Sequence, residues 1–140
     1  MKKNFKTILL APLAVLTVGC NFNQKNKVDV IVISGQSNAV GCTYSYCLKK
    51  SQTAEKYAEY VEGYNEIRIA YESMTKDVNP IKYYSQNRSY KDEFEKVQLG
   101  QGNSVNTFGP EIGIAEKLHK SHGNKLFIIK YACGASNLKD

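Results

Sequence analysis

The most apolar run outside the N-terminal segment lies at residues 28–33, V-D-V-I-V-I, where β-branched side chains surround a single charge. Such a run is short for a helix and typical of a strand that is covered on both faces. Residues 34–41, S-G-Q-S-N-A-V-G, have the composition of a turn. We therefore expect a central buried strand whose carboxyl end carries Ser37 toward the crevice where α/β sheets bind ligands.

A second apolar run, L-F-I-I-K-Y-A, occupies residues 126–132 and follows the clearest helix pattern of the chain. The helix is expected to begin at Pro110, to carry an apolar stripe over residues 114–118, and to end at Gly123. A helix followed directly by a strand favours a right-handed crossover onto a parallel sheet. The pattern thus predicts an α/β fold in which both strands end at the same edge of the sheet.

The stretch between these elements holds nine of the ten tyrosines and is less periodic. It predicts a helix over residues 54–61 that ends at Gly63, with an apolar face at Ala54, Tyr57, Ala58 and Val61. Beyond it we expect a strand with one covered face at 66–71, a short edge segment at 79–84 and a surface loop at 85–106. The tyrosines either stack on sugar rings at a pocket rim or cover a small core.

Residues 1–19 combine a basic start with an apolar run of secretory length, which predicts a signal peptide too short to span a membrane. Thr17-Val18-Gly19-Cys20 resembles a bacterial lipobox. That resemblance implies a mature chain that begins at a lipidated Cys20 and is anchored in the bacterial cell envelope, with residues 20–27 as a polar tether. Plain secretion with cleavage nearby is the alternative.

Charge and cysteine content narrow the function classes. Loss of Lys2, Lys3 and Lys6 with the signal peptide lowers the formal charge from +6 to +3, and no Arg-rich stripe follows, so nucleic acid is not an expected partner. The two histidines lie far in sequence from Cys42 and Cys47, and there is no second cysteine pair, so no metal site is expected. Cys42 and Cys47 are spaced for a local disulfide, with two free thiols as the alternative.

Ser37 is the first candidate for chemistry. An ester hydrolase needs a reachable hydroxyl, backbone N–H donors for the oxyanion, and a base. The turn amides around Ser37 and the N–H of Gly134, at the end of the second strand, can supply the donors. The base is not evident, because His119 and His122 are expected at the opposite edge of the sheet and favour the end of a helix.

Four segments, in order, resemble the SGNH hydrolases, in particular the sialate O-acetylesterase and acetyl xylan esterase-like carbohydrate esterases. They are G-Q-S-N-A-V-G at 35–41, E-I-R-I at 66–69, F-G-P-E-I-G-I-A at 108–115 and I-K-Y-A-C-G-A-S-N-L at 129–138. The resemblance implies a three-layer, flavodoxin-like α/β fold with a parallel sheet. It also implies a cofactor-independent esterase that removes O-acetyl groups from a sialic acid or xylan-type carbohydrate.

By the same resemblance Ser37 is the nucleophile, and the oxyanion hole consists of Ser37 and Gly134. Gln36, Asn38 and Ser136 are candidates for the substrate pocket. Ala135 stands where that family usually has a second glycine, and Ser136 where it usually has threonine.

The family's downstream D-x-x-H, the source of acid and base, has no counterpart in the sequence. Residues 28–140 are therefore expected to be the N-terminal part of such an esterase domain, with little or no activity of their own. The rival hypothesis is a non-catalytic surface lipoprotein that binds glycans on an esterase scaffold.

Overall fold

A computed structural model describes residues 27–78, 81–122 and 125–136, and its centre is one mixed sheet. The strands follow the order β1-β7-β3-β4, and β5 also pairs with β3. Strands β1 and β3 both run parallel to β7, whereas β4 and β5 run antiparallel to β3. The bounds are Val28–Gly35 for β1, Tyr64–Val78 for β3, Ile81–Arg88 for β4, Glu95–Val97 for β5 and Lys125–Gly134 for β7.

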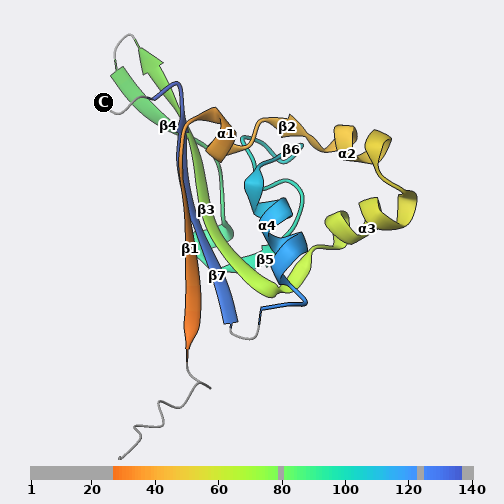
Figure 1. Ribbon diagram of the computed structural model, residues 1–140. Helices are drawn as coiled ribbons and strands as arrows, with labels where there is room; N and C mark the ends of the chain where they lie inside the picture. The colour runs from red at the N-terminus through yellow and green to blue at the C-terminus, as the bar shows by residue number, and fades with distance from the viewer. Residues whose placement is uncertain (1–26, 79–80, 123–124, 137–140) are drawn as a thin grey trace, which may run out of the picture.

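The α-helices of the described residues lie on one side of this sheet, as Figure 1 shows with the sheet seen nearly edge-on. Helices α1 and α4 lie next to the sheet, and α2 and α3 lie farther out. A small antiparallel pair, β2 with β6, joins the segments near α1 and α4. The helices are Ser37–Val40 for α1, Ser45–Ser51 for α2, Ala54–Glu62 for α3 and Pro110–Leu118 for α4; β2 is Thr43–Tyr44, β6 is Thr107–Phe108, and Tyr90–Asp92 form a 3-10 turn.

The predicted parallel pairing is confirmed. Strand β1 pairs with β7 from Val28 opposite Lys125 to Gly35 opposite Ala132, so both strands end at the same edge of the sheet. The chain is thus a mixed α/β protein with a mostly parallel central sheet. Helix α3 ends at Gly63 with φ 82°, as its sequence predicts, and α4 begins at Pro110 but ends at Leu118, before Gly123.

The prediction that β1 is a central strand buried on both faces is wrong for the described residues. Its only described neighbour is β7, and Val28, Val30 and Val32 are 51%, 51% and 68% exposed. The cause is the one-sided placement of the helices: Ile31 and Ile33 face them and pack with the core, whereas the valines face away. No third layer occurs among the described residues (Figure 1).

The tyrosine-rich stretch holds more structure than its pattern predicts. The expected loop at 85–106 contains the end of β4 and all of β5, and the expected strand at 66–71 is part of the longer β3. Helix α2 was not predicted. The expected face of α3 is also wrong, because Val61 is 53% exposed and Tyr60 is the residue that packs into the core.

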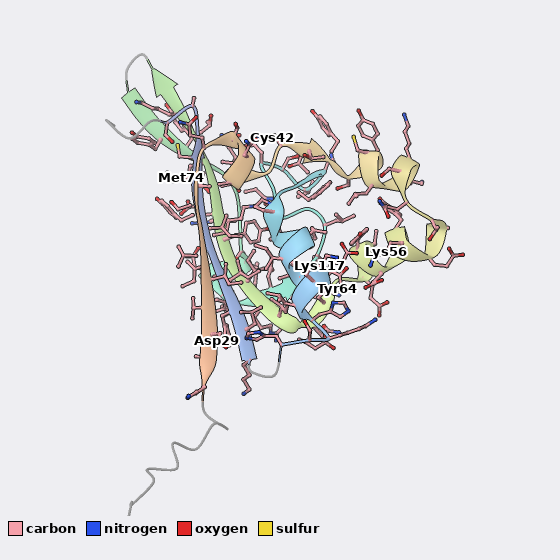
Figure 2. All side chains as sticks on the ribbon, viewed as in Figure 1. Asp29, Cys42, Lys56, Tyr64, Met74 and Lys117 are labelled. Carbon is pink, nitrogen blue, oxygen red and sulfur yellow. The ribbon has the colours of Figure 1, made fainter. Side chains whose placement is uncertain are left out.

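Helices α3 and α4 meet through a small polar cluster. Lys56 Nζ lies 3.0 Å from both Glu59 and Glu116, and the Tyr60 hydroxyl donates to Glu116 over 3.1 Å. The hydrogen bond from Lys56 lowers the pKa of the Glu116 carboxyl, although partial burial opposes the change. This cluster attaches the outer helix α3 to α4, and Figure 2 shows Lys56 and Tyr64 at that junction.

Candidate functional site

Ser37 lies where β1 passes into α1, at the carboxyl end of the sheet. Gly35, the last residue of β1, has φ 147°, a value that L side chains rarely adopt, and Gln36 is extended and caps α1. Ser37 is the first residue of α1 and is exposed, as are its neighbours Gln36 and Asn38. The hydroxyl predicted as a nucleophile is therefore reachable from solvent.

Three glycines fix the end of this turn by close backbone contact. Gly41 has φ 87°, and a Cβ there would overlap the backbone of Gly109. A Cβ on Gly102 would overlap the carbonyl oxygen of Gly41, and the Asn103 N–H donates to that same oxygen over 2.9 Å. Because glycine alone permits such approach, the turn after Ser37 is held directly against the segment that leads into α4.

A buried ion pair stabilises this contact between the two segments. Lys130 Nζ lies 2.8 Å from Glu111 Oε2, both side chains are fully buried, and the same ammonium donates to the carbonyl oxygen of Gln101 over 2.7 Å. Glu111 Oε1 accepts the Gly109 N–H over 2.7 Å. Burial lowers the pKa of Lys130, and the adjacent Glu111 carboxylate counteracts that effect. The pair thus connects β7 to the glycine contacts beside Ser37.

The sequence pattern did not identify this role of Glu111. The signal was present in β7. Every second residue of β7 is buried, namely 126, 128, 130 and 132. Because side chains alternate between the two faces of a strand, the charged Lys130 falls on the buried face. A charge at such a position requires a buried partner.

Ser37 and Asn38 line a hollow of about 500 Å³. Its wall continues through the turn to Gly41, Cys42 and Thr43, and the opposite side is made by Phe108 and the first residues of α4, namely Gly109, Pro110 and Gly113. Of the five predicted site residues, Ser37 and Asn38 therefore line this hollow. Gln36, Gly134 and Ser136 lie outside its lining, near the carboxyl ends of β1 and β7.

Gly134 is the last residue of β7, two positions beyond the residue that pairs with Gly35 of β1. A Cβ at Gly134 would lie 3.7 Å from the nearest atom, an ordinary contact distance, and its φ is not positive. Neither packing nor backbone conformation therefore requires glycine there. Ala135 has a left-handed φ of 59°, and the Ser136 hydroxyl donates to the Cys133 carbonyl over 2.8 Å.

The histidines lie at the other end of the sheet, as predicted. His122 Nε2 is 2.8 Å from Asp29 Oδ2 at the start of β1, and Figure 2 places Asp29 at the end of the sheet opposite Cys42, which follows α1. His119 follows α4 as its C-cap residue; its ring packs on Tyr64 at 4.6 Å, and Nδ1 lies within 3.0 Å of the carbonyl oxygens of Ala115 and Glu116. Among the described residues, neither histidine serves Ser37.

Cys42 and Cys47 are both free and exposed, so the predicted disulfide is absent and the alternative of two thiols holds. Cys47 lies within α2, and Cys42 precedes β2. Within the described ranges no group of three or more His, Cys, Asp or Glu side chains is arranged to hold a metal ion. Within the same ranges no helix is long and apolar enough to cross a membrane. The predicted signal peptide, Cys20 and the tether up to residue 26 lie outside the described residues.

No protein-family model, curated protein or solved structure matches the chain. The class that its own geometry defines is a mixed α/β protein with a solvent-accessible serine at the carboxyl end of a parallel strand.

Proposed function

We propose that the chain carries the nucleophile of a serine esterase that removes O-acetyl groups from carbohydrate, on a sheet of the SGNH type. The observation that carries this proposal is the position of Ser37: exposed, at the carboxyl end of β1, and in the wall of a hollow of about 500 Å³. Nucleophiles presented on the rigid end of a parallel strand face the crevice where α/β folds bind substrates.

In the proposed reaction, Ser37 Oγ attacks the carbonyl carbon of the acetyl ester while a base takes the hydroxyl proton. The bond from that carbon to the sugar oxygen then breaks, and the protonated base gives its proton to the departing sugar. Water attacks the acetyl-serine in the same way and releases acetate, which restores the free hydroxyl.

Backbone N–H groups at the turn would stabilise the oxyanion of both steps. The N–H of Ser37 and that of Gly134 are our candidates. Neither packing nor backbone conformation requires glycine at position 134. A glycine there would instead let a ligand approach the main chain closely, because it has no Cβ.

Neither histidine of the chain is placed to act as this base, since His122 is hydrogen-bonded to Asp29 and His119 packs on Tyr64 at the far end of the sheet. We therefore expect the 140-residue chain to hydrolyse esters slowly at best. Added imidazole in solution can take the proton in place of a protein base.

The experiment is hydrolysis of p-nitrophenyl acetate and of O-acetylated xylan and sialic acid in imidazole buffers, with Ser37→Ala beside wild type. Ser34→Ala is the matched control, because Ser34 is also exposed but lies within β1. We expect a protein-dependent rate that Ser37→Ala abolishes and Ser34→Ala keeps. Equal rates for wild type and Ser37→Ala would contradict the proposal.

We also propose that Cys20 carries a lipid and anchors the mature chain in a bacterial cell envelope. The support is the lipobox-like T-V-G-C at 17–20 behind a basic and apolar segment. Labelling with a palmitate analogue in a bacterial host should mark the wild type and not Cys20→Ala. Equal labelling of the two would contradict the anchor.

A further inference from the structure

A second hollow, of about 440 Å³, has a different character from the one at Ser37. It is lined by Tyr44, Ser45, Tyr46, Lys49, Tyr57 and Asn106. Thr43 lines the first hollow and Tyr44 the second. Because the two are consecutive residues of β2, the second hollow follows the first along the chain.

Aromatic surface dominates this second hollow. The rings of Tyr44 and Tyr46 lie 5.6 Å apart at an interplanar angle of 31°, and each side chain is 54% exposed. Tyr57, half-buried on α3, contributes a third ring. Exposed aromatic rings that cluster in one place are typical of an interaction site, and tyrosine offers an apolar face with a polar edge.

The support of these rings is fixed. Tyr44 belongs to β2, where it pairs with Thr107 of β6, and the Ser45 N–H donates to the Asn106 carbonyl over 2.9 Å. Lys50 Nζ lies 5.1 Å from the centre of the Tyr46 ring. Tyr44 is therefore held by backbone pairing and Tyr46 by a cation–π contact. This support reduces the conformational entropy that the two side chains would lose when a ligand binds.

The polar groups at the hollow are donors rather than acids. The lining contains the Lys49 ammonium and the Asn106 amide, and it includes no Asp or Glu. In the part of the chain that the structure describes, neither of these side chains is engaged in a hydrogen bond or ion pair. A ring-shaped ligand with hydroxyl groups and a negative charge satisfies all of these features.

We propose that this second hollow binds one pyranose ring that bears a carboxylate, as in a uronic or sialic acid unit, through its tyrosine faces and Lys49. The inference rests on the proposed function, because it assigns the sugar next to the acetylated position to this hollow. It thereby narrows the substrate class to acidic glycans.

The test is ligand-observed NMR and isothermal titration with N-acetylneuraminic acid, glucuronic-acid-bearing oligosaccharides and neutral xylo-oligosaccharides. Wild type should bind at least one acidic sugar and bind the neutral one more weakly. Tyr44→Ala should weaken binding about tenfold, equivalent to about 1.4 kcal/mol. Tyr90→Ala, at a ring 71% exposed outside the hollow, should leave binding unchanged.

Lys49→Gln should weaken binding of the acidic sugar and leave the neutral one unaffected, while Lys82→Gln on β4 should change neither. No binding by the wild type, or equal binding of acidic and neutral sugars, would overturn the proposal. The Ser37→Ala variant separates the two hypotheses. If the wild type binds the acidic sugar but shows no hydrolysis that depends on Ser37, the esterase proposal is rejected and the sugar site stands. If hydrolysis depends on Ser37 but no sugar binds, the sugar site is rejected and the esterase proposal stands.

Discussion

Lys130 Nζ and Glu111 Oε2 lie 2.8 Å apart with no solvent exposure of either side chain. The pair joins the middle of β7 to the first turn of α4, and through Glu111 Oε1 it also holds the Gly109 N–H. Gly109 in turn packs on Gly41, four residues beyond Ser37. The position of the candidate nucleophile thus depends on a charged pair within the core.

Removal of one partner of this pair should be costly. We expect Lys130→Met or Glu111→Gln to lower the free energy of unfolding by about 3–5 kcal/mol, because each leaves the other charge buried without compensation. The double variant Lys130→Met with Glu111→Leu should lose less than the sum of the single changes. Urea denaturation measures the free energy of unfolding of each variant. Single variants as stable as the wild type would contradict the buried pairing.

Two glycines that line the hollow at Ser37 should respond oppositely to substitution by alanine. Gly41→Ala should destabilise the fold by at least about 2 kcal/mol, because its φ is 87° and the added carbon overlaps the Gly109 backbone. Gly113→Ala, in α4 with nothing within 4 Å of an added Cβ, should stabilise it by about 0.5–1 kcal/mol. Thermal unfolding compares the two, and equal effects would argue against the contact.

Ala135 offers a test at the loop after β7. Its left-handed φ of 59° disfavours a residue with Cβ by roughly 1–2 kcal/mol, so Ala135→Gly relieves strain and loses some chain entropy. We expect a net stabilisation of up to about 1 kcal/mol, measured by urea denaturation. Ala135→Val should instead be destabilising, and tolerance of valine at wild-type stability would show that the loop does not hold this conformation.

Acid should weaken the contact between α3 and α4. The hydrogen bond from Lys56 lowers the pKa of Glu116 below its ordinary value of 4.5 in the folded chain. The stability from this carboxylate is therefore complete above pH 4.5 and is lost as pH falls through the folded pKa. On acidification below pH 4.5, the free energy of unfolding of the wild type should fall by about 1 kcal/mol more than that of Glu116→Gln. Urea denaturation at a series of pH values measures the difference.

Glu93→Gln is the control for that measurement. Glu93 is exposed and its side chain has no partner among the described residues. The control should follow the wild-type dependence on pH, and identical acid curves for wild type and Glu116→Gln would refute the role of Glu116.

Sequence pattern was sufficient where one physical signal dominated. The β-branched run at 28–33 and the apolar run at 126–132 predicted two parallel strands, and Pro110 and Gly63 marked a helix start and a helix end. Exposure of the outer face of β1 was not predictable from that strand, because its valines are as apolar as its isoleucines. Which face is covered depends on where the helices pack.

Other elements lacked a local signal. The sequence of β4, I-K-Y-Y-S-Q-N-R, is mostly polar and forms a strand by pairing with β3. Helix α2, S-Y-C-L-K-K-S, has no apolar stripe. The wall beside Ser37 depends on Gly41, Gly102 and Gly109 meeting in space, a contact between distant segments that no local pattern contains.

The most direct test of the central claim is the site of acetylation by an activated ester. The 140-residue chain is incubated with p-nitrophenyl acetate in imidazole buffer, quenched with acid and analysed by peptide mass spectrometry, with Ser37→Ala and Ser34→Ala alongside. We predict an acetyl group on Ser37 that disappears on further incubation without ester. Acetylation confined to lysines and the N-terminus, with Ser37 unmodified, would contradict the assignment of Ser37 as a nucleophile.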